Sequence, residues 1–270
     1  MKTILLPIHA DDGAEARLQV ALDLARAHSA HLNCLQVTPL NAYVALDSFG
    51  GAYVMPDLIE VVNKQEAELR KTTEARLGRE DVSWSYEHGD GDPAATIVDR
   101  SSLADLIILS PALREPRPTD PLPLAGDVAI HARTPVCVVP SSAKGFDVGG
   151  TAFVAWNGSA EAAAALKAAL PMLRLAGSVV IATVAEPSED MLPPLDACEY
   201  LSRHGVKAEL LTIERGRGSI ADALLAARDR VGATYVVMGA YGHSRMREFV
   251  LGGATRDMLL GSPTPLFLAH

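Results

Sequence analysis

The sequence predicts an α/β protein in which one doubly wound unit occurs twice. Short apolar runs alternate with segments of helical length, which is typical of βαβ units and a mainly parallel sheet. The strand-like runs are apolar throughout, as expected for strands that are covered on both faces. The second half of the chain repeats the element order of the first half. We therefore expect two tandem, doubly wound, five-stranded and mainly parallel sheets.

The first half contains five expected strands and four expected helices. The strands, each a largely apolar run, are Thr3–Ile8, His31–Val37, Val82–Glu87, Asp105–Leu109 and Pro135–Val139. The helices are about Gly13–Ala27, Pro56–Leu77, Pro93–Ser101 and Leu124–His131. Asp11 and Asp12 are expected to cap the first helix. The connection Thr38–Met55 is expected to be a lid or packing loop, and a ligand beneath it is the alternative.

The second half repeats this order. Its expected strands, again short apolar runs, are Thr151–Trp156, Ser178–Val184, Lys207–Ile213, Thr234–Met238 and Pro265–Leu268. Its expected helices are Ala160–Arg174, a helix near Pro194–Arg203, a helix ending at Arg230, and about Ala254–Leu260. Ser159 and Ser219 are natural N-caps for the first and third of these helices.

Local matches support the duplication. Asp105–Ser110 corresponds to Thr234–Gly239, and Ala132–Val139 corresponds to Gly261–Leu268. A linker rich in small residues lies near 141–145, where such a composition favours a loop. We therefore expect one domain over residues 1–142 and a second over residues 148–270.

Composition narrows the classes of function. The formal net charge of −9 argues against a nucleic-acid or anionic-membrane surface. No apolar run approaches the roughly 20 residues that span a bilayer, and the first residues do not resemble a secretory signal. The three cysteines lack CxxC spacing and are expected to be structural. A cytoplasmic, reducing location fits these features best.

The stretch Met238–Thr255 carries the strongest functional signal. It follows an apolar strand, contains spaced glycines, and runs into a segment that is expected to be helical. Glycine lets the main chain approach a ligand closely, and the free N–H groups of a helix start favour an anion. The pattern therefore predicts a phosphate site, with a structural turn as the alternative.

At this point the chain resembles a tandem universal stress protein over essentially all 270 residues. The second half carries the family's glycine pattern, in which two and then nine residues separate three glycines: Gly239, Gly242 and Gly252. Met238 and the closing Ser-Pro-Thr-Pro segment also match. The resemblance implies strand order 3-2-1-4-5, which places the ends of the first and fourth strands of each half side by side.

The resemblance also implies which residues bind ATP or another adenine nucleotide, with or without Mg²⁺. The expected adenine contacts are Ala155, Asn157, Val184 and Met238. The expected ribose and phosphate contacts are Gly239, Gly242, Gly252, Gly253, Ala254 and Thr255. His243 either contacts phosphate or ribose, or packs within the loop. Trp156 either stacks on the base or packs at the strand end.

Two positions depart from the family pattern. Asn157 stands where the family usually has Asp, so a charged ligand for Mg²⁺ is lost. Gly253 stands where the family usually has Ser or Thr, so a hydroxyl is lost. In the first half, the loop from Ser110 to Pro118 has no glycine and contains three prolines, which donate no main-chain hydrogen bond. We expect that half to be a nucleotide-free partner.

These features predict a cytoplasmic stress-response or regulatory protein that binds an adenine nucleotide in its second domain. The closing strands of the two halves are expected to pair as an internal pseudo-dimer, and two chains can associate further. A nucleotide-free module for an unknown protein partner is the first alternative. A slow ATPase ranks last, because the sequence shows no clear general base. Neither catalytic residues nor metal ligands are expected.

Overall fold

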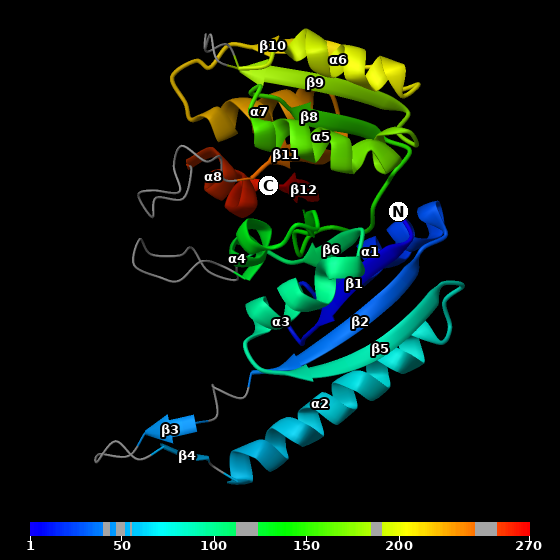
Figure 1. Cartoon of the computed structure of the whole chain (residues 1–270), viewed down its shortest axis with the longest axis vertical. Coiled ribbons are helices and arrows are strands. Elements are labelled where there is room, and N and C mark those ends of the chain that lie inside the picture. The colour runs from blue at the N-terminus through cyan, green and yellow to red at the C-terminus, as the bar shows by residue number, and fades with distance from the viewer. Residues whose placement is uncertain (40–43, 47–51, 55, 112–123, 185–190, 241–252) are drawn as a thin grey trace.

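The computed structural model describes residues 1–39, 44–46, 52–54, 56–111, 124–184, 191–240 and 253–270. The predicted strands and helices are all present in these ranges, most with ends shifted by one or two residues. One pair of strands was not expected. It consists of β3 (Val44–Leu46) and β4 (Ala52–Val54), which pair antiparallel within the long connection of the first half. They lie beside the start of α2 (Pro56–Leu77), away from the main sheet (Figure 1).

The remaining elements of the first half follow the expected order: β1 (Thr3–Ile8), α1 (Ala14–His28), β2 (His31–Thr38), β5 (Ser83–Asp90), α3 (Pro93–Arg100), the 3₁₀ turn Ser101–Leu103, β6 (Leu106–Leu109), α4 (Leu124–His131) and β7 (Val136–Val138). The expected acidic cap of α1 is wrong. Gly13 is the N-cap residue, and no side chain caps the helix. Asp11 instead accepts a hydrogen bond from Gly13 N at 3.0 Å and faces Arg17.

The second half contains β8 (Thr151–Ala155), α5 (Ala160–Leu173), β9 (Ser178–Val184), α6 (Pro194–Arg203), β10 (Glu209–Ile213), α7 (Ile220–Arg230), β11 (Ala233–Gly239), α8 (Gly253–Gly261) and β12 (Leu266–Ala269). Both predicted serine caps are confirmed. Ser159 Oγ accepts from Ala162 N at 3.1 Å, and Ser219 forms a reciprocal capping box with Asp222.

The described strands outside the small β3–β4 pair form one sheet with the order β10-β9-β8-β11-β12-β7-β6-β1-β2-β5. Each half is a parallel five-stranded unit with the predicted order 3-2-1-4-5. The halves meet where β12 pairs antiparallel with β7, and Phe267 lies opposite Cys137. This pairing confirms the internal pseudo-dimer, and it covers two strand edges that would otherwise be exposed.

Helices cover both faces of the sheet (Figure 1). Buried side chains of α1, α2, α5 and α6 form one apolar layer with the strands, and those of α3, α4, α7 and α8 form the other. Both layers run through the two halves. The linker joins the first layer, because the Phe146 ring packs on Tyr235 with centroids 4.9 Å apart, while Phe146 N donates to Asp23 Oδ2 at 2.8 Å.

The strand register defines equivalent positions in the two halves, since the β7–β12 pairing is symmetric about Cys137 and Phe267. The pairs of the neighbouring strands extend this equivalence. Ile107 pairs with Val136, and Val236 pairs with Leu266, so Ile107 is equivalent to Val236. Leu5 pairs with Ile107, and Phe153 pairs with Val236, so Leu5 is equivalent to Phe153. Counting along the strands from these pairs gives the equivalent residues Ile8 and Trp156, His9 and Asn157, Val37 and Val184, and Ser110 and Gly239. The two halves can therefore be compared position by position.

Candidate functional site

Three strands of the second half end together at one edge of the sheet. Met238 of β11 pairs with Ala155 of β8, and Ala155 pairs with Ala182 of β9. Asn157 follows Ala155 by two residues, and Val184 follows Ala182 by two. The structure thus brings Ala155, Asn157, Val184, Met238 and Gly239 to the same edge, where ligands of doubly wound sheets bind.

The predicted site residues differ in exposure. Met238 and Thr255 are buried, Ala155, Val184, Gly239 and Ala254 are half-buried, and Asn157 and Gly253 are exposed. Gly253 is the first residue of α8, and Thr255 lies two residues inside this helix with a buried side chain. Gly242, His243 and Gly252 lie outside the described residues. Their predicted contacts stay predictions.

Gly239 has a packing reason to be glycine. A Cβ atom at this position would lie 2.6 Å from Ala162 N and 2.6 Å from the carbonyl carbon of Glu161. The first turn of α5 therefore presses directly on the end of β11. Gly253 differs, because the nearest atom to a Cβ there is Asp257 Oδ2 at 4.0 Å. Packing against α5 is thus enough to explain why residue 239 is glycine, without a phosphate nearby. At Gly253 no such close contact is found among the described atoms.

The end of β8 is shaped by the segment that precedes α6. Leu192 N donates to Gly158 O at 3.0 Å, and Trp156 Nε1 donates to Leu192 O at 3.1 Å. Trp156 is only 5% exposed, so it packs in the core rather than offering a face for a base. Asn157 Oδ1 accepts from Ser159 N at 3.1 Å and stabilises the turn into α5.

The equivalent edge of the first half is bridged by its own side chains. Arg17 of α1 is 2% exposed, and its Nη1 lies 2.8 and 2.7 Å from the two carboxylate oxygens of Asp11. The same Nη1 donates to Ser110 Oγ at 2.6 Å, and Nη2 donates to His9 O at 3.0 Å. One guanidinium therefore joins the ends of β1 and β6, where the second half has Asn157 and Gly239.

Charge and burial reinforce this bridge. Burial alone would raise the pKa of Asp11, but the hydrogen bond and positive charge of Arg17 outweigh it and hold the pKa below its ordinary value of 3.8. His9 Nε2 lies 2.7 Å from Asp11 Oδ2. Burial lowers the pKa of His9 below 6.5, and Arg17 lowers it further against the opposing effect of Asp11. The neutral imidazole is therefore favoured at pH 7.

Sequence reasoning missed Arg17. Its signal is an arginine among the apolar residues of α1, four positions after Gly13 and six after Asp11. A buried arginine requires a partner, so an acidic residue nearby could have been paired with it from the pattern alone. The link to Ser110 spans 93 residues and follows only from the fold.

The described residues were compared with the requirements of a membrane helix and of a metal cluster. No helix in the described ranges combines the length and the apolar character that crossing a membrane requires. The same ranges contain no group of three or more His, Cys, Asp or Glu side chains that is suited to a metal ion.

Comparison with known proteins identifies the fold family. Residues 1–112 match the model of the universal stress protein family. A universal stress protein from Archaeoglobus fulgidus DSM 4304 is 18% identical, with a TM-score of 0.76, and the match covers 99% of this chain and 97% of that one. A functionally unknown protein from Pseudomonas aeruginosa PAO1 is 16% identical, with a TM-score of 0.62 and coverages of 99% and 92%. No curated protein matches the chain.

The N-terminal half is therefore similar in sequence to the universal stress protein family, and the whole chain has the fold of a solved universal stress protein. The matched family model falls on the half whose strand ends are bridged by Arg17. The glycine pattern of the second half lies outside the matched residues.

Proposed function

We propose that this chain is a regulatory protein that binds one adenine nucleotide, with ATP as the expected ligand, in the domain formed by residues 148–270. The domain formed by residues 1–142 binds no nucleotide. The carrying observation is the contrast between equivalent strand ends: Arg17 joins β1 to β6 through His9 O and Ser110 Oγ, whereas the positions equivalent to His9 and Ser110 in the second half are Asn157 and Gly239.

Apolar and dipolar features at this edge support the proposal. Ala155, Val184 and Met238 offer an apolar wall for a base, as ligand pockets usually do. Gly253 is exposed at the start of α8, a helix of nine residues whose free N–H groups favour phosphate oxygens. Ala254 and Thr255 continue this first turn. Gly242, His243 and Gly252 are proposed to complete the phosphate loop.

Asn157 is the reason why we propose that the nucleotide is bound and not hydrolysed. Its side-chain oxygen already accepts a hydrogen bond from Ser159 N, and it carries no charge with which to hold Mg²⁺. The proposed role is therefore a nucleotide-dependent signal passed to a protein partner in the cytoplasm. Failure to convert ATP to ADP over hours with Mg²⁺ is the expected result of a hydrolysis assay.

The direct test uses purified protein. Denaturation is expected to release an adenine nucleotide, and ATP added to nucleotide-free protein is expected to raise the melting temperature. Gly253→Asp, which places a negative charge where phosphate is proposed to lie, should abolish both effects without unfolding the chain. Ser102→Asp adds the same charge at an exposed position of the first half and should change neither. The absence of released nucleotide together with no thermal shift would reject the proposal.

One observation favours a second candidate, a surface for a protein partner. Met191, Leu192 and Leu195 are 44%, 48% and 60% exposed on the segment that crosses the end of β8. Exposed apolar residues close together often mark an interaction site. A partner whose capture is lost in Leu195→Lys, and is unaffected by ATP or by Gly253→Asp, would favour this candidate.

A further inference from the structure

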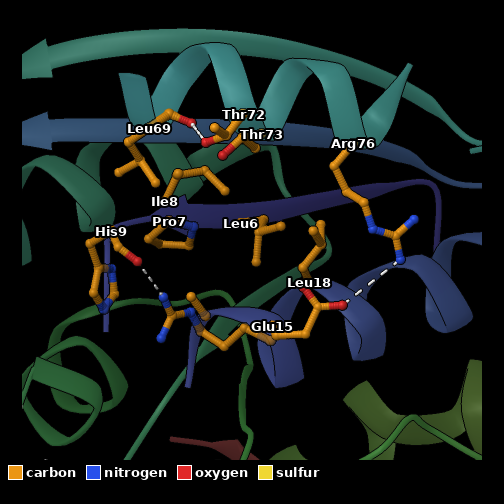
Figure 2. A pocket seen from close by; sticks show the side chains of 12 residues that line it. Leu6, Pro7, Ile8, His9, Glu15, Leu18, Leu69, Thr72, Thr73 and Arg76 are labelled. Atoms are coloured by element: carbon orange, nitrogen blue, oxygen red, sulfur yellow. Dashed lines mark hydrogen bonds and ion pairs between the residues drawn. The ribbon is translucent and has the colours of Figure 1, made fainter. Parts of the chain in front are cut away.

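The first half contains a cavity that is separate from the strand-end site of the second half. It has a volume of about 240 Å³ and lies between α1, α2 and β1 (Figure 2). Leu6 and Ile8 of β1, Leu18 of α1 and Leu69 of α2 form its apolar walls. An apolar cavity of about 150 Å³ is large enough to bind benzene. This cavity therefore has room for a larger ring system.

The duplicated fold explains why the cavity exists. Ile8 is equivalent to Trp156, whose indole is 5% exposed and packs against the layer formed by α5 and α6. The first half thus has a smaller side chain where the second half places an indole. Where isoleucine stands in place of tryptophan, the space that the flat, bicyclic indole would fill stays partly open, because the surrounding structure closes such gaps only partly.

One part of the cavity wall is polar but carries no net charge. Arg17 lines it, and its positive charge is matched by Asp11. Arg17 Nε is buried without a hydrogen-bond partner in the described part of the chain. A ligand carboxylate would approach a guanidinium whose charge is already paired with Asp11.

The charges of the other polar residues in the wall are balanced as well. Arg76 Nη2 lies 3.8 Å from Glu15 Oε1, and this ion pair spans α1 and α2 at one side of the cavity (Figure 2). His9 lies at the other side (Figure 2), and burial lowers its pKa so that the neutral ring is favoured. Neither group of polar wall residues therefore selects a charged molecule.

We infer that the cavity binds an uncharged, flat aromatic molecule of about the size of an indole or naphthalene ring system. The rings lie against Leu6, Ile8, Leu18 and Leu69. This site is independent of the adenine nucleotide proposed for the second half.

The test compares 2-naphthol with 2-naphthoate on the full chain by isothermal titration calorimetry at pH 7. We expect 2-naphthol to bind once per chain and 2-naphthoate to bind at least about tenfold more weakly, because a charged group is costly to bury without a new partner. Ile8→Trp, which copies the second half, should fill the cavity and weaken 2-naphthol binding at least about tenfold. Leu103→Trp adds an indole at a position that is 92% exposed and should leave binding unchanged.

Thr73→Phe provides a second variant, because Thr73 lines the cavity from α2 and is independent of the strand. Circular dichroism identifies which variants are folded. Loss of 2-naphthol binding in a folded Ile8→Trp or Thr73→Phe chain supports the inference. No binding to the wild type, equal binding of both naphthalene compounds, or full binding to a folded cavity-filling variant overturns it.

Discussion

Arg17 Nη1 lies 2.6 Å from Ser110 Oγ, so a single side chain of α1 connects the ends of β1 and β6. At the position equivalent to Ser110 the second half has Gly239, which offers no side-chain acceptor. Gly239 instead lets the first turn of α5 press against β11. The two halves therefore share a fold but use the same strand edge differently.

Replacement of Arg17 tests the bridge. Arg17→Leu removes the partner of a carboxylate that is 7% exposed, and an uncompensated buried charge costs about 3–5 kcal/mol. Urea unfolding at pH 7 should show a loss of this order. Arg203→Leu is the control, since it removes an exposed ion pair worth at most about 1 kcal/mol. Similar losses in the two variants would show that the bridge does not stabilise the fold.

Acid should destabilise the first half in two steps. The pKa of His9 is below 6.5 in the folded chain, so the unfolded chain binds more protons as pH falls below about 6.5, and stability decreases there. The pKa of Asp11 in the folded chain is below 3.8. Its ionised carboxylate therefore stabilises the folded chain above pH 3.8, and this stabilisation is lost as pH falls through the folded pKa.

His9→Asn should therefore reduce the loss of stability between pH 7 and about pH 5, as measured by urea unfolding at each pH. Asparagine is also the residue that the second half has at the equivalent position, Asn157. Ser102→Asn, which changes an exposed residue that does not titrate, should keep the wild-type pH profile. A His9→Asn profile that is identical to the wild type would contradict the assignment.

Two glycines of the predicted loop should respond differently to alanine. Gly239→Ala forces a Cβ into main-chain atoms of α5 at 2.6 Å, and overpacking of this kind typically costs about 1–3 kcal/mol. Among the described atoms, the Cβ of Gly253→Ala meets nothing closer than 4.0 Å, so this change should leave stability unchanged within about 1 kcal/mol. Thermal unfolding without nucleotide distinguishes the two. An undisturbed Gly239→Ala chain would mean that α5 shifts freely away from β11.

The chain should unfold as one unit, because both apolar layers and the β7–β12 pairing cross between the halves. Trp84 lies in the first half and Trp156 in the second, and they are the two tryptophans of the chain. Trp84→Phe and Trp156→Phe therefore leave one probe in each half.

Each single-tryptophan chain should unfold in one fluorescence transition with the same urea midpoint, after correction for any change in stability measured by circular dichroism. Phe267→Ala should lower both midpoints, since a buried Phe→Ala change costs about 3–5 kcal/mol. A shift that is confined to the Trp156 probe would show that the halves fold independently.

Local patterns were enough to predict the layers of this fold. Apolar runs located the ten sheet strands, and the serines before α5 and α7 marked two helix starts. The duplicated closing segments predicted the pairing of β7 with β12. These features depend on neighbours in the sequence and on the repeat itself, and both are visible in a single chain.

Contacts between distant segments could not be predicted in the same way. The approach of α5 to Gly239 depends on residues about 78 positions apart, so a packing glycine resembled a phosphate glycine in the sequence. The sequence around Asp11 favours a helix cap, because its buried partner Arg17 and the link to Ser110 become visible only when β1 and β6 are side by side.

The most direct test of the account is the stoichiometry of ATP binding. Native mass spectrometry of nucleotide-free protein mixed with ATP should show one nucleotide per chain, and Gly253→Asp should remove it while Arg17→Leu, if folded, should retain it. Two nucleotides per chain in the wild type would contradict the nucleotide-free first half, and none would contradict the proposed site at β8 and β11.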